Sequence, residues 1–208
     1  SGSIDELKIS RITRTPEEIK TDTQRRPYGN YISPVLDLGA DISSIDSLVW
    51  TESGVQTGDG ETPYSSTNLV AQWNFNETSG TSAVSGGSCG TSCNGTLTSF
   101  ASTTSQDQAA GTGWTANTRR WGAGALMFDG SNDFVDMNTK VLNSSGSFTV
   151  EAWINQNATA SKAIVGEIGS TNAIGEFLLR TSGSAIQFMR RPTATTSIDL
   201  LTTKTTLV

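Results

Sequence analysis

The chain has 208 residues, a formal net charge of −6 and an apolar fraction of 35%, and this length can bury a core without metal ions or disulfide staples. Its acidic balance and the lack of a basic run argue against a nucleic-acid partner. The sequence also has no run of about 18 apolar residues, which is the length that would predict a membrane span. Because the sequence contains no histidine, it lacks the commonest general base and the commonest ligand of catalytic zinc, and we expect a protein that is not an enzyme.

Residues 1–27 predict a strand followed by a short helix. Apolar and polar residues alternate over residues 4–9, which suits a strand with one buried face. Thr15 can cap a helix, Pro16 fits the first helical turn, and the glutamate three residues after the cap can close a capping box. We therefore expect a helix over residues 16–23.

Residues 28–62 predict a small β connector, and residues 63–208 predict the main domain. Within the main domain, the stretch at residues 76–118 is rich in Ser, Thr and Gly and predicts mostly surface loop. Short strands with turn residues between them follow, which is typical of an all-β sandwich. The predicted strands lie at residues 31–38, 47–51, 69–75, 125–128, 134–137, 148–155, 163–168, 176–180, 185–190 and 197–201.

Cys89 and Cys93 are the two cysteines of the chain. An even number of cysteines in a sequence of this composition predicts a disulfide, here closing a tight loop, and an extracellular location. The alternative is a redox or metal-binding pair. That alternative would require Cys-X-X-Cys spacing or further ligands, and the sequence has neither.

Three segments resemble the laminin G-like family of concanavalin A-like lectin and glucanase domains. They are residues 69–77 (LVAQWNFNE), residues 124–130 (GALMFDG) with 133–135 (DFV), and residues 147–153 (SFTVEAW). The resemblance implies an antiparallel jelly-roll-type β-sandwich and an extracellular surface protein of a bacterium or archaeon. It does not identify a ligand.

The order of the segments differs from that of the family. Residues 2–9 (GSIDELKI) and 15–19 (TPEEI) resemble the last strand and trailing helix of the same family, but here they come first. The chain also ends before the strand that in this family usually carries a Trp-His pair. Two interpretations remain: a window on a tandem array, with the tail of one repeat and the first part of the next, or a subunit that exchanges strands with its neighbour.

Both interpretations predict the same kind of function, because a truncated sandwich needs other strands to cover its edges. We expect a structural or adhesive repeat, or a subunit of an extracellular filament or cell-surface protein, whose partners are other copies of itself or adjacent repeats. The alternative is a lectin-like carbohydrate-binding module that recognises surface glycans.

A calcium site is predicted at Asp129, Asn132 and Asp133, because these residues place several side-chain oxygens within one turn. The family resemblance would add Asp5 or Glu6 from the terminal strand, and calcium is the candidate cofactor. The alternative is an ordinary Asp-Gly hairpin turn, which needs glycine for a positive φ and requires no metal.

Sugar binding would require exposed aromatic platforms, for which Tyr64, Trp114 and Trp121 are the candidates. The alternative is that these aromatic residues pack a long loop against the sandwich, as Trp73 and Trp153 are expected to pack in the core. Glycoside hydrolysis would require two converging carboxylates. Three glutamates on separate predicted strands could share a face, although solvated side chains on a sheet surface are the expected alternative: Glu151, Glu167 and Glu176.

Overall fold

The computed structural model describes residues 1–24, 61–63, 65–107, 111–142, 146–167, 176–193 and 196–201, together with single positions between 32 and 49. Most residues of the predicted strands at 31–38 and 47–51, and the candidate Tyr64, lie outside this described part. The strands of the described part are β1 (Gly2–Ser10), β2 (Leu69–Trp73), β3 (Ser82–Ala83), β4 (Gly95–Thr98), β5 (Gly113–Thr115), β6 (Ala125–Phe128), β7 (Phe134–Asp136), β8 (Thr149–Gln156), β9 (Ala163–Glu167), β10 (Phe177–Ser182), β11 (Ala185–Thr193) and β12 (Thr196–Leu201). The helix α1 spans Pro16–Gln24, and a 3₁₀ turn spans Gly90–Cys93.

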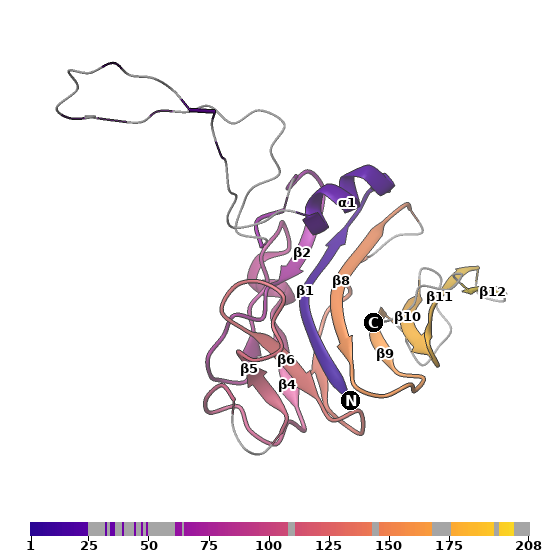
Figure 1. Ribbon diagram of the computed structural model, residues 1–208. Helices are drawn as coiled ribbons and strands as arrows, with labels where there is room; N and C mark the ends of the chain where they lie inside the picture. Colours follow the sequence, from indigo (N-terminus) through magenta and orange to yellow (C-terminus); the bar gives the residue numbers. More distant parts are fainter. Residues whose placement is uncertain are drawn as a thin grey trace.

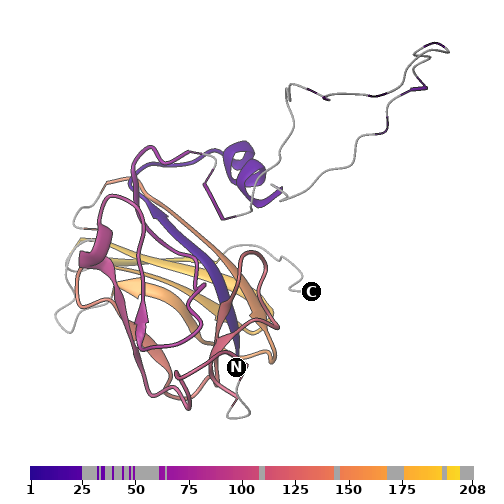
Figure 2. The same cartoon turned by 90° about the vertical axis from the view of Figure 1, so that its left-hand side faces the viewer.

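Three antiparallel sheets make up the fold, which is the all-β sandwich that the strand spacing predicted. The five-stranded sheet has the order β2-β1-β6-β5, with β8 also paired to β1. The four-stranded sheet has the order β12-β11-β10-β9, and the three-stranded sheet has the order β3-β4-β7. Figures 1 and 2 show β1 beside β8 in one layer, with the four-stranded sheet in a second layer.

The N-terminal strand β1 lies in the middle of the five-stranded sheet. On one side it pairs along its length with β8, and on the other side it pairs with β6 near Ile4 and with β2 near Leu7. The helix that follows begins with the predicted capping box: the Glu18 N–H donates to Thr15 Oγ1 at 3.2 Å, and the Thr15 N–H donates to Glu18 Oε2 at 2.8 Å.

The hydrophobic core fills the space between the layers. Its largest fully buried side chains include Trp73 of β2, Ile9 of β1, Leu126 of β6 and Phe177 of β10. Phe148 precedes β8, and its ring lies 5.2 Å from that of Phe177, so the core contacts join the two main sheets.

Among the described residues, 76–118 are mostly loop, as predicted, but the prediction missed several short elements there. This stretch contains β3, β4, β5 and the 3₁₀ turn, and it buries Ala83, Leu97 and Trp114. Glycine in this stretch also serves close packing between strands. A Cβ at Gly95 would lie 2.3 Å from Val135 Cγ1 on the neighbouring strand β7. The Gly-rich composition therefore predicted loop at positions where short strands form.

The predicted disulfide between Cys89 and Cys93 is present, and it encloses the 3₁₀ turn. The indole N–H of Trp73 donates to the Cys93 carbonyl at 3.0 Å, which ties this turn to the core. In the part of the chain that the structure describes, no helix is both long and apolar enough to cross a membrane.

Candidate functional site

Polar contacts as well as apolar ones fix β1 and the residues after it against β8. The Arg14 guanidinium lies 3.6 Å from the Glu151 carboxylate, and both side chains are largely buried. Thr149 Oγ1 accepts the Arg14 N–H at 2.9 Å and donates to the Ile12 carbonyl at 2.8 Å. Lys8 of β1 also forms a buried ion pair with Asp22 of α1 at 3.5 Å, so strand and helix are held as one unit.

Two acidic residues of β1 are buried in the middle of the strand. Asp5 Oδ2 accepts the N–H groups of Arg120 at 2.6 Å and Trp121 at 3.2 Å, while Asp5 Oδ1 is buried without a hydrogen-bond partner in the described residues. Glu6 has a positive φ of 52° at the irregularity where the pairing of β1 with β8 shifts register. Burial raises the pKa of Asp5 to about 6. Burial, together with the nearby charges of Asp5 and Glu61, raises the pKa of Glu6 to about 9.

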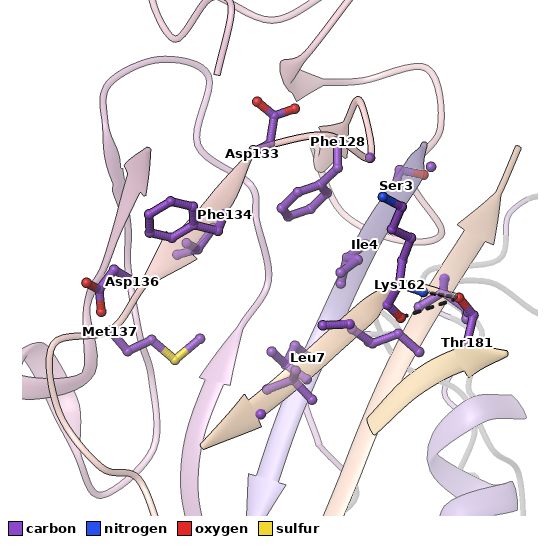
Figure 3. A pocket seen from close by; sticks show the side chains of 18 of the residues that line it. Ser3, Ile4, Leu7, Phe128, Asp133, Phe134, Asp136, Met137, Lys162 and Thr181 are labelled. Carbon is purple, nitrogen blue, oxygen red and sulfur yellow. Dashed lines mark hydrogen bonds between the residues drawn. The ribbon is translucent and has the colours of Figure 1, made fainter. Parts of the chain in front are cut away.

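An apolar cleft of about 610 Å³ opens between the layers (Figure 3). Ile4 and Leu7 of β1, Phe128 of β6 and Phe134 of β7 surround it. The Phe134 side chain is 50% exposed although it is large and apolar. Lys162 and Thr181 supply polar groups at one end, where the Lys162 N–H donates to Thr181 Oγ1 at 3.1 Å.

Of the predicted calcium ligands, the structure brings Asp129 and Asp133 together but places Asp5 elsewhere. Asp129 and Asp133 form bonds within their own turn: the Asp129 N–H donates to Asp133 Oδ2 at 2.7 Å, and Gly130 has the positive φ of 78° expected of a hairpin. Asn132 is exposed. The turn lies beside the start of the chain, since a Cβ at Gly130 would lie 2.5 Å from the Ser1 nitrogen. Asp5 is four residues further along the strand and therefore lies about 13 Å from Ser1.

The described residues contain no group of three or more His, Cys, Asp or Glu side chains arranged to hold a metal ion. The contacts at residues 129–133 are compatible with an ordinary hairpin turn. Asp133 Oδ1 is buried without a hydrogen-bond partner in the described residues, and the calcium site stays a prediction. The buried carboxylates of Asp5 and Glu6 lie away from that turn.

The described aromatic candidates pack inside the fold rather than presenting open platforms. Trp114 is 2% exposed, and its indole N–H donates to the Gly80 carbonyl at 2.8 Å. Trp121 is also buried, and the Arg120 guanidinium lies 4.9 Å from its ring centroid and 4.5 Å from that of Trp153. The expected core position of Trp73 is confirmed, while Trp153 is partly buried beneath Arg120.

The three candidate glutamates make separate structural contacts. Glu151 pairs with Arg14, and Glu176 pairs with Arg191 at 3.1 Å. Glu167 Oε1 accepts the Leu142 N–H at 2.7 Å. Burial is the largest cause of the raised pKa of both Glu151 and Glu167. Each of these three side chains therefore has a contact that stabilises the fold.

Comparison of the chain with models of protein families, with curated proteins and with solved structures finds no significant match.

Proposed function

We propose that this chain is a structural or adhesive repeat, or a subunit, of an extracellular filament or cell-surface protein in which neighbours complete each other's sandwich by exchanging a strand. The observation that carries the proposal is the position of β1. This strand comes first in the sequence, yet it lies between β8 on one side and β2 and β6 on the other.

The position that β1 occupies between β8 and the strands β2 and β6, here called the slot, has to be filled for the fold to be stable. Without β1, the backbone groups of β8 and β2 that face it would be left unpaired, and an exposed strand edge is a template for another chain. Burial of Leu7 and Ile9 adds roughly 1.5–3 kcal/mol for each side chain. The sandwich therefore binds this strand by the same contacts whether the strand comes from the same chain or from a neighbour.

Residues 25–68 join α1 to β2. A segment of this length can span on the order of 140 Å when fully extended, and the entropy of closing a loop rises only slowly with its length. The connection is therefore long enough for β1 to reach the slot of an adjacent copy, which is the geometry of strand exchange. The disulfide between Cys89 and Cys93 supports an oxidising, extracellular compartment.

Cross-linking in the observed register tests the proposal. Ser3 of β1 lies opposite Asn155 of β8, so a Ser3→Cys/Asn155→Cys variant will form a disulfide between chains wherever β1 has been exchanged. We expect a ladder of covalent multimers on non-reducing gels, growing with protein concentration. A Ser3→Cys/Thr96→Cys variant is the matched control, because Thr96 lies on β4 in another sheet. Exclusive cross-linking within single chains at every concentration would refute strand exchange.

A further inference from the structure

The cleft between the layers follows two strands over their whole lengths. Every residue of β9 lines the cleft, and so does every residue from 133 to 140 around β7. The N-terminal part of β1 also lines it with consecutive residues, from Gly2 to Ile4, although that part is paired on both sides. The pairing of the strands, rather than the lining, therefore shows which of them has a free edge at the cleft, and within the described residues β9 and β7 each have one.

Both of these edges are open among the residues that the structure describes. There, β9 pairs with β10 and β7 pairs with β4, and neither has a second partner. The direction of the open edge of β9 can be assigned near its start. Lys162 directs both its N–H and its carbonyl toward Thr181, so the N–H of the next residue, Ala163, points away from β10.

The far end of the same sheet offers a matching edge. Within the described residues β12 pairs with β11 alone. All neighbours in this four-stranded sheet are antiparallel, so the outer strands β9 and β12 run in opposite directions. When one copy is translated along the sheet, its β12 therefore meets β9 of the next copy in antiparallel orientation. The two strands are also similar in length, at five and six residues.

We propose that the cleft receives a second copy of this chain, whose β12 pairs with β9 and continues the four-stranded sheet from copy to copy. This inference rests on the proposed function, because it supplies a contact by which the copies of a filament associate. A small apolar ligand would cover Phe134 but would leave the backbone groups of β9 without partners. The contact joins different surfaces of the two copies, so it generates an open-ended polymer rather than a closed dimer.

A proline at the open edge tests this contact. Ala163 is exposed, and Ala163→Pro removes the N–H that faces away from β10, a position where an edge strand tolerates proline. Light scattering of the full chain should show mass increasing with concentration, and we expect Ala163→Pro to need at least about tenfold higher concentration for the same mass, a loss of roughly 1.4 kcal/mol. Ser82→Pro, on the exposed edge strand β3, is the matched control and should assemble like the wild type.

Hydrogen exchange keeps the test independent of whether the variant folds. In the wild-type chain, the amides of residues 163–167 should become protected in concentrated samples, while those of β3 should not. A folded Ala163→Pro variant that assembles like the wild type would overturn the inference, as would unchanged exchange at β9. If the Ser3→Cys/Asn155→Cys chain still forms covalent multimers when it also carries Ala163→Pro, the result supports strand exchange but not the β9 contact. Cross-links within single chains, combined with assembly that Ala163→Pro weakens, would uphold the β9 contact alone.

Discussion

Replacing Ile9 with alanine tests how much the N-terminal strand contributes to the fold. Ile9 is 1% exposed, and it lies opposite Ala71 of β2 and Val150 of β8. The substitution removes three carbon atoms, which accounts for about 2.4 kcal/mol of lost burial, and a residual cavity of about 70 Å³ adds about 1.7 kcal/mol. We therefore expect the free energy of unfolding to fall by about 4 kcal/mol, a large part of the 5–15 kcal/mol that is typical of a domain.

Urea titration followed by tryptophan fluorescence measures this loss, because the buried Trp73 of β2 lies opposite Leu7, which is on β1 like Ile9. Val84→Ala is the matched control: it also removes methyl groups, but Val84 is 54% exposed, so its effect should stay within about 0.5 kcal/mol. A loss below about 1 kcal/mol for Ile9→Ala would refute the reasoning, because it would mean that β1 is not part of the cooperative core. In a strand-exchanged assembly, the full loss would weaken each exchanged contact by about three orders of magnitude.

The remaining predictions concern the buried acids beside β1. Protonated Glu6 is favoured in the folded state, with a pKa of about 9 against 4.5 for the ordinary side chain, so the contribution of Glu6 to stability should be fully present below about pH 4.5 and be lost as the pH rises toward 9. Urea unfolding at pH 5, 7 and 9 should show this loss, and Glu6→Gln should remove most of it; an unchanged loss in that variant would contradict the assignment. Glu151→Gln should lower the free energy of unfolding by about 1–3 kcal/mol, because it removes the charge facing the buried Arg14 guanidinium. That guanidinium keeps its hydrogen bonds to Ser10 Oγ and to the Ser65 and Thr67 carbonyls. The exposed Glu17→Gln control should change little, and equal effects of the two would show that the ion pair does not stabilise the fold.

Local sequence patterns predicted the strands that follow residue 118, because their apolar residues recur between clear turns. The predicted 125–128 strand coincides with β6, and the predicted 163–168 and 185–190 strands correspond to β9 and β11. The capping box at Thr15 needed no tertiary information either. Such features depend on residues a few positions apart, which is the range that a sequence pattern describes.

Contacts that depend on pairing distant segments could not be predicted in this way. Arg14 and Glu151 meet because β1 lies beside β8, and neither residue belongs to a motif that specifies the other. Trp114 falls in the stretch predicted as loop because Gly and Thr surround it, although it lies on β5 opposite Leu126 of β6 and is buried. The open edges of β9 and β7 follow from the order of strands in the sheets, which side-chain alternation does not encode.

The two inferred contacts make different demands on concentration. A β1 strand tethered by residues 25–68 meets its own slot at an effective concentration on the order of millimolar, and a neighbour's β1 makes the same contacts in that slot. Exchange therefore competes with self-closure only where neighbours are held at a comparable local concentration. The β12 strand of the same chain cannot compete for the β9 contact, because β12 and β9 are opposite edges of one sheet. Association at β9 would raise the local concentration of neighbouring strands, so edge pairing should come first and strand exchange should follow within the assembled polymer.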